Sequence, residues 1–215
     1  MSPIIKDLLE KKCNYMPNEV INKMTWQGPV KVIVKTSNSG VQLENTPHPN
    51  SNPILYRWLV DKDKFDKLTG LLQVKHKNTI QNAKKQLAEI TKIEEKRGDK
   101  IYYALYFGKS KKGISRITRE HLGNDMSKST LRRSLCGLFV PNYVSDKEPE
   151  IDKLLDGSYF EWLELASTDK EYLVCLEAIC IALGKYPLNI DGNPFLAEHP
   201  DWEKLLKESR KELKK

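Results

Sequence analysis

The sequence predicts an α+β protein in which helices flank a small three-stranded antiparallel sheet. Three short segments have the apolar composition and length of strands: residues 54–60, 100–108 and 159–165. Longer segments separate and follow them, and their apolar residues recur at helical spacing, as in residues 78–96, 127–139 and 169–183. Strands and helices mixed in this order are typical of a sheet covered by helices.

The bulk properties indicate a single domain with additional segments. The chain has 215 residues and a net charge of +7, which suits a polyanionic partner. No apolar run is long enough to cross a membrane, and the N-terminus lacks a signal-peptide pattern. We therefore expect a cytoplasmic protein without a membrane partner. The four cysteines include no C-x-x-C pair, which favours free thiols over zinc ligands or disulfides.

The first half of the chain contains an extension and an insertion. Residues 1–52 are predicted to be an N-terminal extension that begins with helical apolar spacing and includes an alternating, strand-like segment at residues 29–36. After the strand at residues 54–60, residues 61–100 are polar and mainly helical. Residues 78–96 place apolar side chains on one helix face, which indicates an amphipathic surface helix or a surface for a partner.

The second half begins with the strand that ends at Gly108. A lysine-rich loop follows it, and then a predicted helix over residues 114–122 that carries Arg116 and Arg119. A tyrosine, a glycine and several cations brought to one sheet edge can hold a phosphate. The remaining predicted helices cover residues 127–139, 146–156, 169–183 and 201–215. Thr168 or Asp169 is the expected cap of the third.

One carboxylate lies among apolar neighbours in the predicted helix at residues 169–183. On an ideal helix, Glu177 is surrounded by apolar residues three and four positions away, namely Leu173, Val174, Cys180 and Ile181. An unpaired carboxylate in such a position is costly, so a cation must lie nearby. That cation is either a buried arginine or a divalent metal ion, Mg²⁺ or Mn²⁺, which often takes only one or two protein carboxylates.

Several short motifs together resemble the GIY-YIG nuclease superfamily. Pro53-Ile54-Leu55-Tyr56 is similar to the first motif, with proline in place of glycine, and Tyr106-Phe107-Gly108 is similar to the second. Arg116 follows Tyr106 by ten residues, and Glu177 precedes the Pro187-Leu188-Asn189 ending. Residues 129–135 resemble a segment of stand-alone bacterial members. The chain departs from the family in the insertion between its two tyrosine motifs, which are usually joined by a short hairpin.

The resemblance covers residues 53–195 and implies a nuclease domain of that extent, preceded by the extension and followed by a C-terminal helix at residues 196–215. It implies hydrolysis of DNA phosphodiesters to 5′-phosphate and 3′-hydroxyl ends. Tyr56 would be the general base, and Lys109 and Arg116 would have to lower its pKa, because a free phenol is a poor base at neutral pH. Tyr106 would position water.

The metal side of the implied site rests on Glu177. It would bind Mg²⁺ or Mn²⁺, and Asn189 would orient Glu177 or the metal shell. Arg116 offers a fork of donors to phosphate oxygens. His121 has either a catalytic role, as in some restriction-type members, or a surface or capping role, because five residues turn it about 140° from Arg116 on an α-helix.

Further cations are candidates for phosphate contacts with DNA, or else solvated surface charges: Lys111, Lys112, Arg119, Lys128, Arg132 and Arg133. We therefore expect a metal-dependent DNA endonuclease, with restriction or defence as the favoured pathway. The alternative is a degenerate member that binds nucleic acid without cutting it, an alternative supported by Pro53. The sequence leaves a homodimer open.

Overall fold

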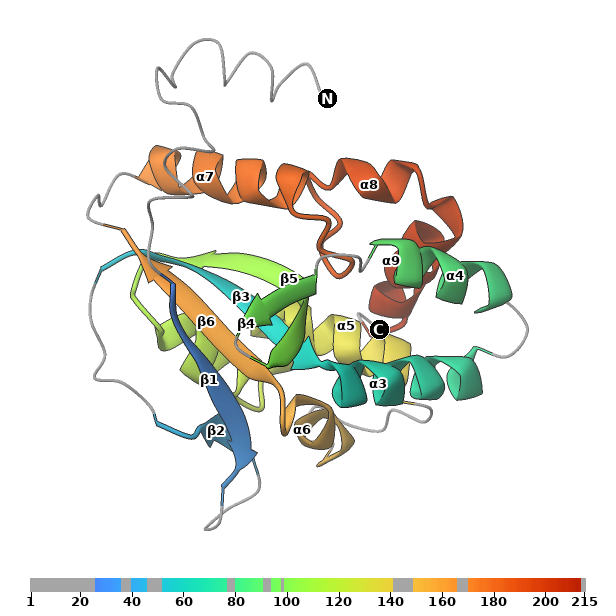
Figure 1. The fold of residues 1–215 in the computed structure, drawn as a ribbon, viewed down its shortest axis with the longest axis horizontal. Coiled ribbons are helices and arrows are strands. Elements are labelled where there is room, and N and C mark those ends of the chain that lie inside the picture. The colour runs from blue at the N-terminus through green and yellow to red at the C-terminus, as the bar shows by residue number, and fades with distance from the viewer. Residues whose placement is uncertain are drawn as a thin grey trace.

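A computed structural model describes residues 26–35, 40–45, 52–76, 80–90, 94–97, 99–140, 149–165 and 170–213. The helix predicted at the N-terminus and the capping residues Thr168 and Asp169 lie outside these ranges. The described strands form one six-stranded sheet in the order β2-β1-β6-β3-β5-β4 (Figure 1). Their bounds are β1 Gln27–Val34, β2 Val41–Leu43, β3 Ile54–Asp61, β4 Glu94–Arg97, β5 Lys100–Ser110 and β6 Tyr159–Glu164.

The α+β class agrees with the sequence, but the sheet is wider than the three strands predicted. The predicted strands are β3, β5 and β6, and β3 pairs antiparallel with both of the others. The extension adds β1, which pairs with β6, and β2, which pairs with β1. The insertion adds β4, which pairs with β5. Its sequence, EEKR, carries no apolar alternation, so backbone pairing alone places it at the edge.

The insertion contains two helices and β4 instead of a helix over residues 78–96. Helix α3 covers Lys62–Lys75 and helix α4 covers Ile80–Ile90. Asp61 caps α3, because its side chain accepts a hydrogen bond from Lys64 N at 2.9 Å. Leu87 of α4 is buried, in agreement with the predicted amphipathic face.

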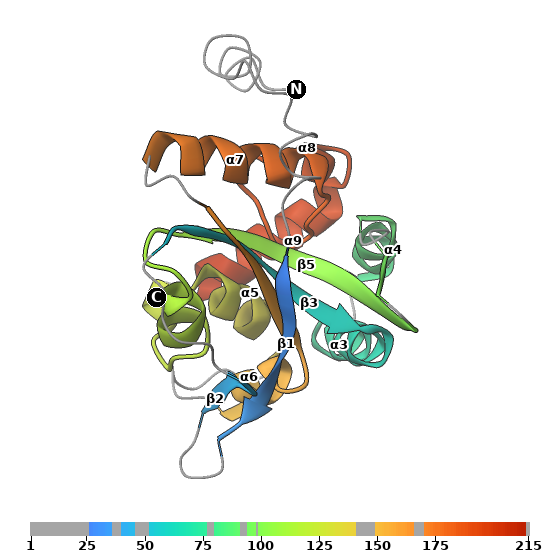
Figure 2. The same cartoon turned by 60° about the vertical axis from the view of Figure 1, so that its left-hand side comes forward.

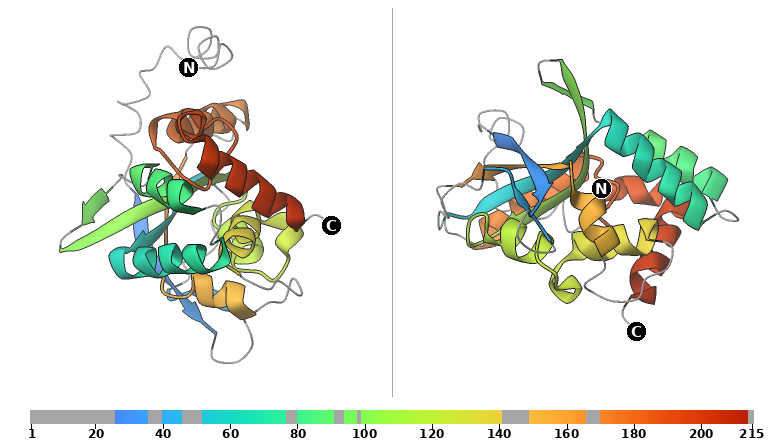
Figure 3. Two further views of the ribbon diagram at one scale, coloured as in Figure 1. Left: turned by 90° about the vertical axis from the view of Figure 1, so that its right-hand side faces the viewer. Right: turned by 90° about the horizontal axis from the view of Figure 1, so that it is seen from below.

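Helices cover both faces of the sheet. Helix α7, Lys170–Leu183, lies on one face, whereas α3, α5 (Thr130–Phe139) and α6 (Pro149–Leu155) lie on the other (Figures 2 and 3). Side chains of β3 alternate between these layers: Tyr56 and Trp58 belong to the core on the α5 side, and Leu55 and Leu59 belong to the core under α7. Residues of β3 therefore reach both layers.

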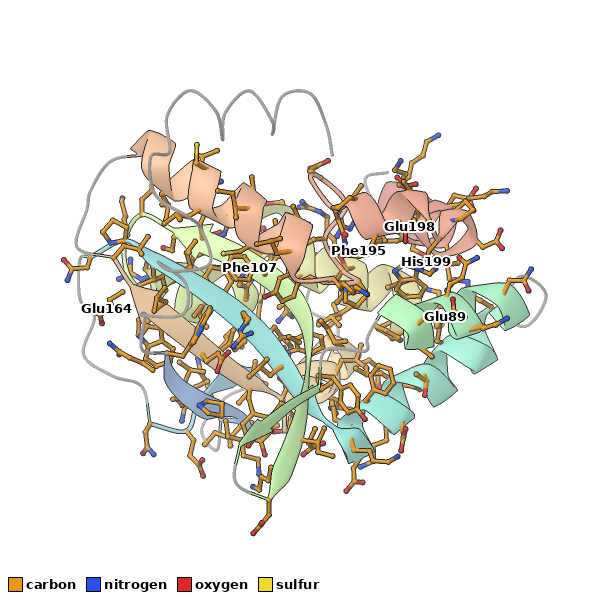
Figure 4. The ribbon with its side chains drawn as sticks, turned by 45° about the horizontal axis from the view of Figure 1, so that its top comes forward. Glu89, Phe107, Glu164, Phe195, Glu198 and His199 are labelled. Atoms are coloured by element: carbon orange, nitrogen blue, oxygen red, sulfur yellow. The ribbon has the colours of Figure 1, made fainter. Side chains whose placement is uncertain are left out.

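The C-terminal helices close the α5 side. Helix α8 covers Pro194–Ala197, and helix α9, Pro200–Glu212, packs against α5 and α4. Gly137 permits this packing, since a Cβ atom there would lie 2.5 Å from Ser209 O. His199 Nδ1 lies 3.8 Å from Glu89 Oε2, where α9 begins beside α4 (Figure 4). Among the helices that the structure describes, none is long and apolar enough to cross a membrane.

Candidate active site

Strand pairing places Tyr56 directly beside Gly108. The two residues are opposite each other in the β3–β5 register, and the Tyr56 ring crosses the space that a side chain at position 108 would fill. A Cβ atom at Gly108 would lie 2.4 Å from Tyr56 Oη, a distance that real Cβ contacts do not reach. The glycine is therefore required by the tyrosine across from it, which links the two sequence motifs physically.

This contact gives a first prediction. Gly108→Ala should destabilise the fold by about 1–3 kcal/mol, since the added methyl forces the buried Tyr56 phenol to move. Gly70→Ala is the control, because nothing lies within 4 Å of a Cβ atom at that exposed site in α3. It should stabilise the chain by about 0.5–1 kcal/mol. Urea unfolding of both variants measures the difference, and equal stabilities would contradict the close packing.

Tyr56 makes its hydrogen bond with His121, which is 65 residues away in the sequence. Tyr56 Oη and His121 Nε2 are 2.6 Å apart. The other ring nitrogen, His121 Nδ1, lies 2.7 Å from Ser129 Oγ. All three residues have a relative exposure of 0%. His121 is thus a buried partner of Tyr56, and the surface role that the sequence left open for it is excluded.

The helix that carries His121 differs from the predicted α-helix. Arg116–His121 is a short π-helix, and Leu122 N donates to Ile117 O, five residues earlier, at 2.9 Å. Residues five apart lie closer to one side in this geometry than in an α-helix. The 140° separation expected between Arg116 and His121 is therefore wrong. Both residues affect Tyr56: His121 is hydrogen-bonded to it, and Arg116 lowers its pKa.

Burial controls the pKa values of this cluster. It lowers the pKa of His121 to about 3, and Arg116 and Arg132 act in the same direction, so the imidazole is neutral at neutral pH. Burial raises the pKa of Tyr56 well above its usual value, with a further rise from Tyr106. Arg116 lowers the pKa of Tyr56, but this effect is smaller than the effect of burial. The expected depression of the Tyr56 pKa is thus absent in this state.

The low pKa of His121 predicts a pH effect on stability. Between about pH 6.5 and pH 3 the unfolded chain binds a proton at His121 that the folded chain does not bind. Stability is therefore complete above pH 6.5 and falls on acidification by up to about 1.4 kcal/mol per pH unit. His121→Asn should have a flatter dependence in this window when unfolding is measured against pH. Parallel curves for the two proteins would contradict the buried neutral imidazole.

Arg116 lies at the margin of the cluster, with its side chain 31% exposed. Its Nη1 donates to Lys109 O at 3.1 Å, and its Nε lies 3.2 Å from Glu120 Oε2. Glu120 was not among the predicted site residues, although its spacing of four residues from Arg116 is a signal for a helical ion pair. The partly exposed guanidinium retains N–H groups that can bind a phosphate.

Glu177 approaches the cluster from α7, on the other side of β5. Its carboxylate pairs with Lys109 Nζ, and the two side chains are 20% and 22% exposed. Glu177 lies within the electrostatic range of Tyr56, because it contributes to the rise in the pKa of that phenol. The carboxylate is less enclosed than the sequence predicted, since its neighbour Val174 is 47% exposed. The cation that pairs with it is the Lys109 ammonium, where the sequence predicted an arginine or a divalent metal ion, and the metal stays a prediction.

The described residues around Glu177 offer few protein ligands for a metal ion. Among the described residues, no group of three or more His, Cys, Asp or Glu side chains is arranged to hold one. Glu177 is a single, partly exposed carboxylate, and only its Oε2 is engaged within the described part of the chain. A hard divalent ion bound there would complete its coordination with water and phosphate oxygens, which suits Mg²⁺.

Asn189 holds the chain after α7 against β5. Phe107 N donates to Asn189 Oδ1 at 2.8 Å, and Asn189 Nδ2 donates to Phe107 O at 2.9 Å. Both ends of the amide thus bind the backbone of one residue, and Figure 4 shows Phe107 on β5 beneath α7. Asn189 therefore fixes the strand between Tyr106 and Gly108, and its predicted role in orienting Glu177 or the metal shell stays a prediction.

The predicted DNA-binding cations fall into two groups. Lys111, Lys112, Arg119 and Lys128 are exposed, and Lys128 Nζ lies 2.8 Å from Asp125 Oδ2. Arg132, by contrast, is 1% exposed and lies 3.1 Å from Asp152 Oδ1, so the expectation that it contacts DNA is wrong.

Arg133 is half-buried and donates to two carbonyls of the preceding turn, those of Met126 and Ser127. The sequence shows two adjacent arginines, and only the fold distinguishes the fully buried Arg132 from the half-buried Arg133.

Comparison with known proteins agrees with this arrangement. Residues 54–212 match the sequence model of the GIY-YIG catalytic domain. The matched segment contains all the residues of the cluster, from Tyr56 on β3 to Glu177 on α7, and extends to the end of α9. Searches of curated proteins and of solved structures found no match. The chain belongs to the GIY-YIG family, whose catalytic domain is that of a nuclease.

Proposed function

We propose that the protein is a divalent-metal-dependent endonuclease that hydrolyses DNA phosphodiesters. The observation that carries the proposal is the convergence of four residues from two strands and two helices, namely Tyr56, Tyr106, Arg116 and Glu177. They lie close enough for both charges to affect the pKa of each tyrosine. Acid–base groups, a cation and a carboxylate at one place are the parts that phosphodiester hydrolysis requires.

Each side chain has a distinct part in the proposed reaction. Arg116 binds the phosphate through its free N–H groups and stabilises the charge that develops there. Tyr56 acts as a base in its deprotonated form, which Arg116 favours, and then accepts a proton from the attacking water, while Tyr106 positions that water. Lys109, released from Glu177 when phosphate enters, is a second cation for the phosphoryl oxygens. Glu177 would hold Mg²⁺ or Mn²⁺, which supplies charge stabilisation at the phosphate and at the leaving 3′ oxygen.

Exposed basic residues support a nucleic-acid substrate. Lys111, Lys112 and Arg119 lie on the loop and helix that connect Lys109 to His121, and all three are exposed. Cations beside a phosphate-cleaving site bind the neighbouring phosphates of the same strand without reading its sequence.

Binding should consequently depend on salt. The triple variant Lys111→Ala, Lys112→Ala, Arg119→Ala should lower the slope of log K against log salt concentration by about 0.9 for each lost phosphate contact on duplex DNA. Fluorescence anisotropy with a labelled duplex measures this slope. The matched control removes the same charge from exposed lysines of α9, at Lys204, Lys207 and Lys211. An equal change of slope in both variants would contradict this location of the DNA.

The proposal is tested with a pool of mixed sequences in duplex, single-stranded and branched DNA and in RNA, incubated with Mg²⁺. Sequencing of the products and labelling of their ends identify the substrate. Cleavage of DNA to 5′-phosphate and 3′-hydroxyl ends supports the proposal, and a restriction or defence role would further require a preferred sequence or modification state. Cleavage of RNA alone would replace DNA as the substrate.

The complete burial of Tyr56 favours a second candidate, a protein that binds nucleic acid without cleaving it. A phenol without solvent access and with a raised pKa is a poor base. Salt-sensitive DNA binding without product in any pool, with Mg²⁺ or Mn²⁺, would establish this candidate in place of the first.

A further inference from the structure

The buried hydrogen bonds around His121 allow its tautomer to be assigned. The chain of contacts runs from Arg132 N to Ser129 Oγ at 3.0 Å, from Ser129 Oγ to His121 Nδ1 at 2.7 Å, and from His121 Nε2 to Tyr56 Oη at 2.6 Å. A neutral imidazole donates from one nitrogen and accepts at the other. The proton on the ring is therefore fixed by what its two partners can donate.

Ser129 is limited by its role as the cap of α5. Its oxygen accepts the hydrogen bond of Arg132 N, as the cap of a helix does. Its hydroxyl proton then needs an acceptor, because the residue has a relative exposure of 0%. Within the described part of the chain, His121 Nδ1 is the acceptor available to it. A proton on Nδ1 would leave the buried Ser129 hydroxyl without an acceptor, which is unfavourable.

At the other end of this series of hydrogen bonds, Tyr56 can accept a hydrogen bond from His121 in place of donating one. If His121 donates from Nε2 to Tyr56, the Tyr56 proton must point elsewhere. Tyr106 lies beside Tyr56, with the two ring centroids 6.4 Å apart, and Tyr56 influences the pKa of Tyr106. The Ser129 hydroxyl then donates to His121, and His121 donates to Tyr56, whose own proton points towards Tyr106.

We infer that Ser129 is a positioning residue of the nuclease site, because its hydroxyl donates to His121 Nδ1 and so holds His121 as a hydrogen-bond donor to Tyr56. His121 is then not the final acceptor of the Tyr56 proton. It stabilises negative charge on the Tyr56 oxygen, while the proton of Tyr56 is directed towards Tyr106 and the charged groups Arg116 and Glu177 beside it.

This assignment gives residues 129–135 a function beyond starting a helix. Ser129 is N-terminal to α5, and its two hydrogen bonds tie the cap of that helix to a residue of the π-helix. The serine thereby joins the fold of α5 to the orientation of the imidazole. The tautomer assignment rests on the hydrogen bonds around Ser129 and His121, whereas the effect on cleavage rests on the proposed function.

The test is ¹⁵N NMR of the full chain with labelled histidines at pH 7, in which His121 is assigned by its absence from a His121→Asn variant. Wild type should show the proton on Nε2 and a bare Nδ1. Ser129→Gly removes the hydroxyl but remains an acceptable cap, and Ser129→Thr keeps both. We expect the glycine variant to lose the single-tautomer pattern and the threonine variant to keep it.

Cleavage kinetics complete the test. Ser129→Gly should lower kcat by about 10–100-fold, the range found when the partner that orients a histidine is removed, with little change in KM. Ser129→Thr should restore the rate. A proton on Nδ1 in wild type, or an unchanged pattern in Ser129→Gly, would overturn the inference. If no variant and no wild type cleaves, the proposed function fails, and the NMR pattern still decides the tautomer.

Discussion

Tyr56→Phe is expected to lower the cleavage rate by about 10²–10⁴-fold, the range found for a positioned general base. The substitution removes only the hydroxyl, so the ring keeps its place across Gly108. Because His121 Nε2 loses the partner at 2.6 Å, stability should also fall, by about 1–3 kcal/mol. Single-turnover kinetics and urea unfolding separate the two effects, provided that the rate is measured where the variant is folded.

Tyr103→Phe is the matched control for this substitution. Tyr103 lies half-buried on β5, and its ring stacks on Phe65 with the centroids 4.7 Å apart. Loss of its hydroxyl should change stability by less than about 0.5 kcal/mol and leave the rate unchanged. Wild-type rates in both variants would remove Tyr56 from the proposed chemistry.

Glu177→Gln is expected to abolish most of the activity with little effect on the fold. Loss of a carboxylate that holds a catalytic metal removes several kcal/mol of charge stabilisation in the transition state, which corresponds to at least about 10²-fold in rate. The ion pair with Lys109 is partly exposed, so its loss should change stability by at most about 1 kcal/mol. Cleavage rates and unfolding curves measure both expectations.

Glu198→Gln is the corresponding control, because Glu198 is exposed beside α8 (Figure 4). It carries the same chemical change outside the proposed site, so we expect a wild-type rate and a wild-type affinity for Mg²⁺. A large loss in this variant would indicate that the assay responds to surface charge and not to a metal ligand.

The main strands could be predicted because their apolar segments have a local signature. β3, β5 and β6 have apolar segments of strand length, and β1 alternates apolar and charged residues, whereas β4 has only the polar sequence EEKR and depends on its neighbour β5. A helix was predicted at residues 114–122 and the structure has one at Arg116–His121, but no local pattern distinguishes its π-helical form from an α-helix.

The contacts within the site could likewise be predicted only in part. The motifs indicate Tyr56, Arg116 and Glu177, but no local pattern indicates that Tyr56 meets His121, because β3 and the π-helix become neighbours only through the sheet. Ser129 belongs to the segment at residues 129–135 that resembles other family members, but its contact with His121 Nδ1 is visible only in three dimensions. Burial likewise reverses the expected direction of the Tyr56 pKa, since desolvation outweighs the nearby cation.

The most direct test of the proposed metal-dependent nuclease site is the conversion of a supercoiled plasmid by wild type and Glu177→Gln, purified in parallel. Each protein is assayed with Mg²⁺, after addition of a chelator, and after Mg²⁺ is restored. We predict that wild type cuts the DNA, stops on chelation and resumes, while Glu177→Gln remains inactive throughout. Equal cutting by the two proteins, or cutting by wild type that persists in the chelator, would contradict a metal-dependent nuclease centred on Glu177.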